Sequence, residues 1–194
     1  MPVAWTHVGR FWTNGEPFLA VDEDLLPAWR GMSDEAYEAL VPHLDYELSS
    51  IPVGAGSAAI VLTDPEIGDE GWLEVFRGDD GSIAVLQVSA ENYRDVLELA
   101  LRFPATDDQP GDGVAVPSGR LAFVSAALDG TGDDGALLMP ESPGATPQSD
   151  DAEPDDRSPL LVVPPGSFTM SVRWRTELGE DAAFARWTFA RVDR

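Results

Sequence analysis

The sequence predicts one α+β domain in which antiparallel β-sheet predominates, built from hairpins in a sandwich-like or rolled arrangement, with about three short helices. Short apolar runs outnumber segments of helical periodicity along the chain. Consecutive runs are joined by tight Gly-containing turns, which suit antiparallel neighbours and are too short for the crossovers of a parallel sheet. The 194 residues suffice for one sizeable core, so residues 1–194 are treated as a single domain.

The first two strands are expected within residues 3–21, where aromatic and aliphatic residues flank Asn14-Gly15. Asn-Gly between apolar stretches is a strong short-range signal for a β-hairpin. The aromatic side chains of this stretch are expected to anchor the core.

Two short helices are expected next. An acidic triplet that begins at Asp22 precedes the segment Leu25–Trp29, and acidic groups favour a helix N-terminus. Ser33 is expected to cap a second helix, in which residues from Tyr37 to Leu44 keep helical spacing. Pro42 must kink or split that helix.

The central stretch predicts a hairpin in the middle of a sheet. Ile51–Val53 and Ala58–Leu62 are apolar runs joined by Gly54-Ala55-Gly56, and Asp64-Pro65 ends the second run. Continuous apolar runs fenced by Gly and Pro are typical of strands buried on both faces.

A second hairpin is predicted from Trp72–Phe76 and Ser82–Val88, which flank the turn Gly78-Asp79-Asp80-Gly81. Ser89 is expected to cap the clearest helix of the chain. Between Tyr93 and Ala100 the apolar residues fall at i, i+3, i+4 and i+7.

One phrase occurs twice in the second half. Val116-Pro117-Ser118-Gly119-Arg120-Leu121 and Val163-Pro164-Pro165-Gly166-Ser167-Phe168 both place Pro and Gly between apolar runs. Each is expected to turn the chain between antiparallel strands. Residues 182–192 are expected to form a last strand that pairs with residues 168–176.

Residues 140–159 lack aromatic and β-branched aliphatic side chains and are rich in Pro, Ser and acids. Such a segment buries too little apolar area to offset the entropy lost on ordering. A disordered acidic surface loop is therefore expected here.

Charge is the unusual property of the chain. It has 35 acidic residues against 12 basic ones, all Arg, which gives a net charge of −23. A surface this negative disfavours nucleic acid and anionic membranes as partners and favours a basic protein. Solubility alone is the competing explanation.

The chain has no Cys, which excludes disulfides and thiolate chemistry. No secretion signal or membrane-length apolar run is visible in the sequence, so a soluble, cytoplasmic protein is expected.

Three short patterns resemble cofactor or metal sites, but the residues around each pattern do not suit such a site. Gly54–Ala59 has the letters of a dinucleotide-binding turn, but a strand and not a helix follows it. Asp129–Gly135 resembles a calcium loop, but Pro140 stands where the bidentate Glu belongs. His7 and His43 lie in unrelated segments, which does not suit a zinc site. No catalytic residue, cofactor or metal is therefore predicted.

Several short pieces between Gly15 and Pro65 occur in a characteristic order. They are Gly15-Glu16-Pro17-Phe18-Leu19, Leu25-Leu26, Trp29-Arg30-Gly31, Asp45-Tyr46, Ile51-Pro52-Val53-Gly54 and Ala59-Ile60-Val61-Leu62-Thr63-Asp64-Pro65. This order resembles the immunity protein 21 family of bacterial polymorphic toxin systems. Two features depart from the family pattern: no Cys follows Asp45-Tyr46, and residues 140–159 look like an insertion.

The resemblance implies a small protein that neutralises a cognate toxin by tight non-covalent binding, with no catalytic residues. Together with the net charge it favours a basic toxin, and nuclease toxins are basic because they bind phosphate. The expected contacts are acids at turns and helix starts, where carboxylates are free: Asp22, Glu23, Asp24, Asp69, Glu70, Asp79 and Asp80.

Two other functions stay open at this point. A small enzyme that uses a carboxylate pair would need a cleft in which one carboxyl pKa is strongly raised beside an apolar wall. An acidic scaffold or interaction module would spread its acids evenly over the surface.

Overall fold

A computed structural model describes residues 3–40, 50–131, 135–179 and 181–192. The strands are β1 (Trp5–Thr13), β2 (Phe18–Asp22), β3 (Ser50–Val53), β4 (Gly56–Val61), β5 (Gly71–Gly78), β6 (Ile83–Ala90), β7 (Gln109–Pro110), β8 (Val114–Val116), β9 (Arg120–Ser125), β10 (Leu137–Pro140), β11 (Arg157–Val162), β12 (Gly166–Gly179) and β13 (Ala182–Arg191). The helical segments are the 3₁₀ turns η1 (Glu23–Ala28) and η2 (Gly31–Ser33) and the α-helices α1 (Glu35–Leu40) and α2 (Tyr93–Arg102).

The strands form two sheets, which confirms the predicted α+β class dominated by antiparallel strands. Sheet A has seven strands in the order β1-β5-β6-β13-β12-β7, and β8 also pairs with β12. Sheet B has six, in the order β10-β11-β9-β2-β4-β3. The pair β10–β11 is parallel, and the other strand pairs are antiparallel.

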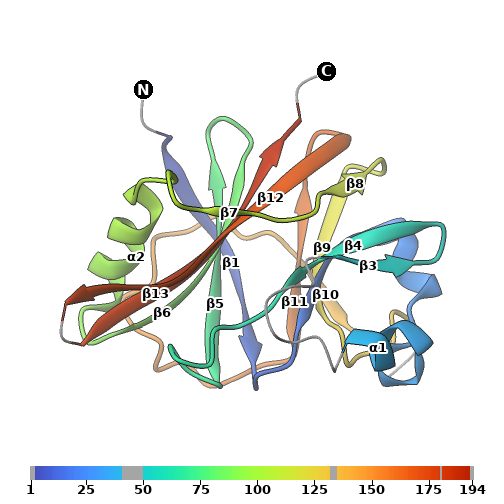
Figure 1. Cartoon of the computed structure of the whole chain (residues 1–194), viewed down its shortest axis with the longest axis horizontal. Coiled ribbons are helices and arrows are strands. Elements are labelled where there is room, and N and C mark those ends of the chain that lie inside the picture. Colours follow the sequence, from blue (N-terminus) through green and yellow to red (C-terminus); the bar gives the residue numbers. More distant parts are fainter. Residues whose placement is uncertain (1–2, 41–49, 132–134, 180, 193–194) are drawn as a thin grey trace.

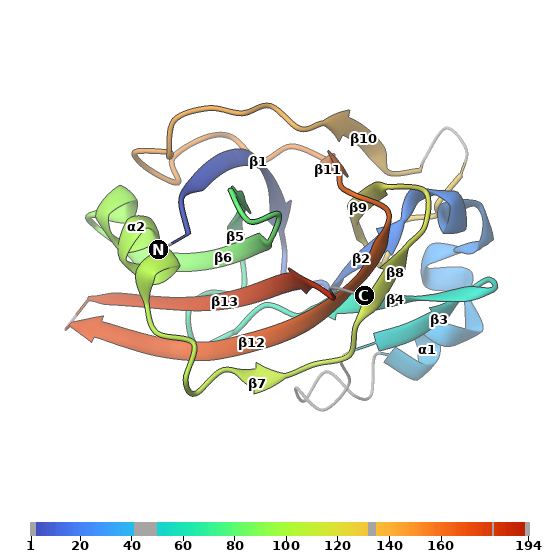
Figure 2. The same ribbon diagram turned by 90° about the horizontal axis from the view of Figure 1, so that it is seen from above.

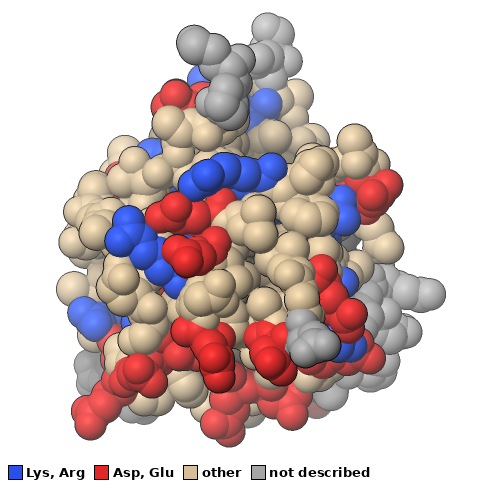
Figure 3. Space-filling model, turned by 90° about the vertical axis from the view of Figure 1, so that its left-hand side faces the viewer, with Lys and Arg blue, Asp and Glu red and all other residues tan. Residues whose placement is uncertain are grey.

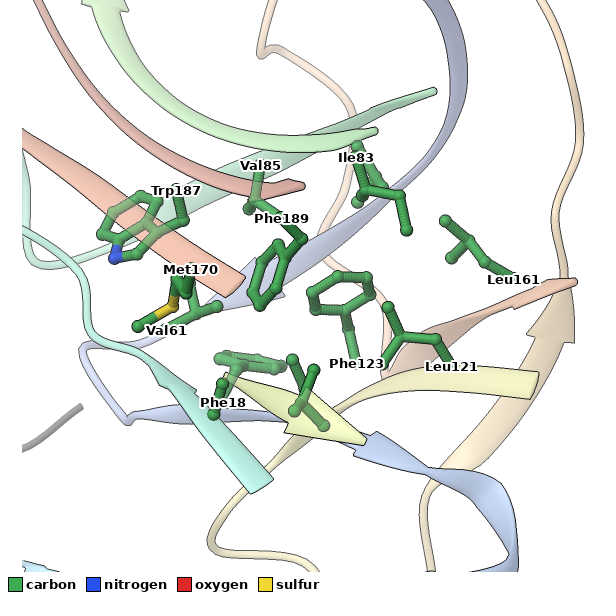
Figure 4. Close-up of a cluster of buried hydrophobic side chains, with 14 of the residues drawn as sticks. Phe18, Val61, Ile83, Val85, Leu121, Phe123, Leu161, Met170, Trp187 and Phe189 are labelled. Atoms are coloured by element: carbon green, nitrogen blue, oxygen red, sulfur yellow. The ribbon is translucent and has the colours of Figure 1, made fainter. Parts of the chain in front are cut away.

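The two sheets share one core between their inner faces. Alternate residues of each strand point inward, as the period of a β-strand requires. Figure 4 shows Phe18 and Phe123 of sheet B turned toward Phe189 and Trp187 of sheet A. The rings of Phe123 and Phe189 meet edge to face with centroids 5.8 Å apart.

Helical segments cover the two outer faces (Figure 1). The apolar stripe of α2 packs on the outer face of sheet A, as its spacing predicts. The segments η1 and α1 pack on the outer face of sheet B. The predicted caps are wrong: Ser89 lies within β6, and the carboxylate of Asp34, not Ser33, accepts the Ala36 backbone N–H at 2.9 Å.

The expected hairpin at Asn14-Gly15 is wrong. Both strands exist, but β1 pairs with β5 in sheet A, whereas β2 pairs with β4 and β9 in sheet B. The Asn-Gly segment therefore carries the chain from one sheet to the other. β2 is buried along its whole length, and both strands pair within larger sheets, whereas an isolated two-stranded hairpin is at best marginally stable.

The central hairpin forms, as β3 and β4, but it does not lie in the middle of a sheet. β3 is an edge strand of sheet B and alternates between buried and exposed residues. Pro52 suits that position because an edge strand can lack one backbone donor. The predicted continuation of α1 toward Leu44, with Pro42 and Asp45-Tyr46, lies outside the described residues.

The repeated phrase builds a corner between the sheets. The first copy joins β8 of sheet A to β9 of sheet B, and the second joins β11 of sheet B to β12 of sheet A. Neither is the simple hairpin turn that was expected. Val116 faces Gly166 and Arg120 faces Val162 in one continuous register, and between them the Val163 N–H donates to Gly119 O at 2.8 Å. Two bent strands thus pass the corner together, as in orthogonally packed sheets.

Residues 141–156, which we call the strap, are described in the structure, and the disorder expected for 140–159 stays a prediction. The strap runs outside β1 (Figure 2). The backbone N–H groups of Ser142 and Gly144 donate to Val8 O and His7 O, at 2.8 and 3.0 Å. The strap thereby covers an otherwise open sheet edge, which is a common way to protect an edge strand. No helix among the described residues is long and apolar enough to cross a membrane.

Candidate functional site

One end of sheet A gathers acidic side chains from distant parts of the sequence. β5 begins at Gly71, β6 ends at Ala90 and β13 begins at Ala182. Antiparallel pairing places these three strand termini side by side, at the same end of the sheet. Acids stand directly beside each of them: Asp69 and Glu70 before β5, Glu91 after β6 and Asp181 before β13.

A network of hydrogen bonds holds the loop before β5 against this end of the sheet. The side chain of Gln87 accepts from Asp64 N at 2.7 Å and donates to Gly68 O at 2.8 Å. The carboxylate of Asp64 in turn accepts from the backbone N–H of Arg175 in β12 at 2.9 Å. These hydrogen bonds hold Asp64 and Gly68, which directly precedes Asp69, against Gln87 of β6 and Arg175 of β12.

The same end of sheet A carries a surface depression. A depression of about 560 Å³ is lined by residues that include Glu66, Glu177 and Asp181. Arg175 lies in it and donates to Glu66 at 2.7 Å and to Glu177 at 2.8 Å. Hydrogen bonding to Glu66 raises the pKa of Arg175 above its ordinary value.

We call the six acids of this edge the acidic rim: Glu66, Asp69, Glu70, Glu91, Glu177 and Asp181. Figure 3 shows Asp and Glu gathered along the lower part of the face that carries α2. Arg175 is the one cation that the depression contains among the described residues. Arg175 pairs with Glu66 and Glu177, so the attraction for ammonium and guanidinium groups comes chiefly from the exposed carboxylates of the other four rim acids.

Two of the predicted contact residues, Asp69 and Glu70, belong to the rim. Asp79 and Asp80 lie at the opposite end of β5, in the turn to β6. There Asp79 accepts from Ala4 N at 3.0 Å, and Asp80 accepts from the Ser82 hydroxyl, which lowers the pKa of Asp80. The seven predicted residues therefore do not form one site.

The other three predicted contacts, Asp22, Glu23 and Asp24, lie at the end of β2 in sheet B and the start of η1, next to the corner. Asp22 is wrongly predicted as a free carboxylate: it is fully buried and accepts from Asp24 N and Ser118 N, both at 2.9 Å. Glu23 is ion-paired with Arg120. Asp24 is exposed.

Sequence reasoning missed Glu66, Glu91, Glu177 and Asp181 as rim residues. They come from separate segments, and acids are so frequent in this chain that no local pattern distinguishes them. The pairing of β5, β6 and β13, from which their proximity follows, is a long-range property. Only the hairpin β5–β6 was available as a local signal.

The described residues also contain buried carboxylates, and these are fully engaged. Glu74 has no exposed side-chain surface and accepts from His7 Nε2 at 2.7 Å, Arg10 at 2.9 Å and the Tyr93 hydroxyl at 3.0 Å. Burial, and next the charge of Glu74, raise the pKa of Tyr93 beyond its ordinary range.

A second buried carboxylate, Asp108, bonds both Arg173 and Arg186. Among the residues that the structure describes, the carboxyl groups whose pKa departs clearly from the ordinary value are Asp80, Asp129 and Asp155, and in all three the pKa is lowered. No group of three or more His, Asp or Glu among the described residues could hold a metal ion.

Comparisons with family models, with curated proteins and with solved structures found no match to this chain. The likeness of Gly15–Pro65 to the immunity protein 21 family therefore stays a prediction.

Proposed function

We propose that this chain is an immunity-type protein, which neutralises a basic bacterial toxin in the cytoplasm of the producing cell by binding it without covalent chemistry. The observation that carries the proposal is the acidic rim at one end of sheet A, where Glu66, Glu177 and Asp181 line a depression that contains one Arg among the described residues, and Asp69, Glu70 and Glu91 stand beside the neighbouring strand ends. The net charge of −23 and the resemblance of Gly15–Pro65 support the same function.

The rim would act by occupying the basic surface of the toxin. A nuclease must present Lys and Arg to phosphate, and carboxylates at fixed positions can take the place of that phosphate. The depression offers room for one long basic side chain beside Glu177 and Asp181. Summed charge also speeds association, by about 10- to 1,000-fold for strongly complementary partners.

Two observations favour binding over the alternatives. An enzyme with a carboxylate pair calls for a raised carboxyl pKa, and the clear carboxyl pKa shifts in the described part of the chain are downward. A scaffold with merely solubilising charge calls for an even spread of acids, whereas Asp69, Glu70, Glu91 and Asp181 all stand beside the same end of sheet A.

Co-expression with the protein encoded immediately upstream tests the proposal. We expect the two proteins to co-purify, and the chain to rescue the growth of cells that produce that protein. The rim variant Asp69→Asn/Glu70→Gln/Asp181→Asn should weaken both effects, while Asp79→Asn/Asp80→Asn, at the other end of β5, should leave them intact. Failure of the wild-type chain both to co-purify and to rescue growth would overturn the proposal.

A further inference from the structure

The corner built by the repeated phrase carries a second depression, which the acidic rim does not involve. Its volume is about 760 Å³, within the range of about 300–1,000 Å³ that is common for small-ligand sites. It is lined by Ala115, Pro117, Pro165, Gly166, Ser167, Arg191 and Val192. Each copy of the phrase contributes to it, the first through Pro117 and the second through Pro165.

The depression lies on the outer side of the corner. Ala115 and Ser167 point away from the core, because their neighbours Val114, Val116 and Phe168 are buried in it. Figure 1 shows β8 beside the first residues of β12 at this corner.

Arg191 is unusual among the described arginines. Each of the other described arginines has a carboxylate oxygen within 4.0 Å, whereas Arg191 has none among the described residues. This is notable in a chain with almost three acids for each Arg. A Cβ atom added at Gly166 would lie 3.8 Å from Arg191 Nε, so the guanidinium lies beside Gly166, which also lines the depression.

The lining determines what chemistry the depression can accept. Arg offers only donors, so the group that meets Arg191 must be an acceptor and is best an anion. The Ser167 hydroxyl is a further donor. Pro117, Pro165 and Val192 have apolar side chains, and proline has no backbone N–H to offer. The surroundings therefore suit an apolar side chain next to a carboxylate.

We propose that this depression binds a peptide carboxylate that is attached to a short apolar segment, with Arg191 as the charged contact. A free small anion can bind only weakly to a chain of net charge −23, whereas a carboxylate on a basic protein is also brought in by the attraction of that protein. The carrier would thus be the basic partner, and this part of the inference rests on the proposed function. The corner would then be a second anchor, separate from the acidic rim.

The experiment uses the full chain alone and a defined probe. ¹⁵N-labelled protein is titrated with N-acetyl-Val-Val-Leu bearing a free C-terminal carboxylate, to about 10 mM because affinities near 1 mM are expected for so small a ligand. We expect shifts of the Ala115, Ser167 and Arg191 resonances. The same peptide with a C-terminal amide should bind about tenfold more weakly, because it lacks the charge-assisted hydrogen bond.

Arg191→Gln should weaken binding of the carboxylate peptide by about tenfold or more. Arg102→Gln is the matched control, since it removes an exposed Arg that already pairs with Glu98. Absence of shifts, equal binding of the amide, or an unchanged affinity of Arg191→Gln would overturn the proposal. Equal shifts with inorganic phosphate would overturn it as well, since they would indicate a general anion site.

The titration separates this inference from the proposed function, because it needs no toxin. A chain that binds the peptide but captures no toxin would overturn the proposed function and the assignment of the carrier, and keep the carboxylate site. A chain that captures the toxin but does not bind the peptide would overturn the carboxylate site alone.

Discussion

Glu74 is a buried side chain whose negative charge is important for the stability of the fold. It has no exposed side-chain surface, and three donors converge on it from β1 and α2: His7, Arg10 and Tyr93. Glu74→Gln keeps the shape but removes the negative charge beside Arg10. We expect the free energy of unfolding to fall by about 3 kcal/mol, because breaking a buried pair leaves the other charge uncompensated.

Urea denaturation at neutral pH measures that loss. Glu98→Gln is the matched control, because Glu98 also meets two arginines but on the half-exposed surface of α2. The control should change the free energy of unfolding by about 0.5 kcal/mol or less. Equal losses in the two variants would contradict the structural role given to Glu74.

Asp80 offers a test through its pKa. The Ser82 hydroxyl and backbone N–H both donate to its carboxylate, at 2.5 and 2.9 Å, and hydrogen bonding to the charged form lowers the pKa of Asp80. Ser82→Ala should therefore raise the pKa of Asp80 toward its ordinary value of about 3.9. Carboxyl ¹³C shifts followed through an acid titration measure this directly.

The sign of the stability effect follows from the same shift. A carboxyl group whose pKa is lower in the folded than in the unfolded protein stabilises the fold at pH values above its pKa in the unfolded chain. This stabilisation is lost as the pH falls through the pKa of the group in the folded protein. Ser82→Ala should thus be less stable than wild type at pH 7, and the difference should narrow in acid. A difference that grew in acid would contradict the assignment.

Asp22 shows where residue-level reading of the sequence fails. Its neighbours Glu23 and Asp24 are at least partly exposed, and local sequence makes no distinction among the three. The difference arises from Ser118, which lies 96 positions along the chain and donates its backbone N–H to Asp22. A contact that distant is created by the corner and leaves no trace in the local pattern.

At the scale of elements, local chemistry was sufficient wherever neighbours in sequence pair in space. The hairpin β5–β6 and the buried face of α2 follow from periodicity and one Gly-containing turn. Turn chemistry says that the chain reverses, but it does not say which sheet the next strand joins. Asn14-Gly15 and both copies of the Val-Pro phrase therefore turn where predicted but lead into the other sheet.

The corner itself can be tested at Gly119. Its φ is +75°, and a Cβ atom there would lie 2.9 Å from Val163 O, the carbonyl of the strand that shares the bend. Gly81 is the matched control, since it has φ +83° and no heavy atom within 4 Å of its built Cβ. Each substitution to Ala should cost about 1–2 kcal/mol for the left-handed backbone.

Gly119→Ala should lose about 1–3 kcal/mol more than Gly81→Ala, because it also forces two paired strands apart. Thermal or urea unfolding of the two variants gives the difference. Equal costs would mean that the corner has room to relax and does not depend on close contact between the two copies of the phrase.

At the scale of the whole molecule, the question is whether total charge or its placement drives association. The rim and the β5–β6 turn lie at opposite ends of β5, which has eight residues. At about 3.3 Å per residue they are about 26 Å apart. That separation is larger than the electrostatic screening length of about 8 Å at physiological salt, so charges at the two ends act independently there. It is slightly shorter than the screening length of about 30 Å at 0.01 M salt, where they act together.

Two double variants separate placement from total charge, because each removes two negative charges. We expect Asp69→Asn/Glu70→Gln and Asp79→Asn/Asp80→Asn to slow association with the co-purified toxin by similar factors in 0.01 M salt, where the whole charge of the chain acts.

At about 0.15 M salt only charges close to the contact affect association. There the rim variant should remain slower than wild type by about threefold to tenfold, and the turn variant should match wild type. Stopped-flow measurement of wild type and both variants at the two salt concentrations gives all six rates, and equal slowing of the two variants at 0.15 M would mean that the rim does not touch the toxin.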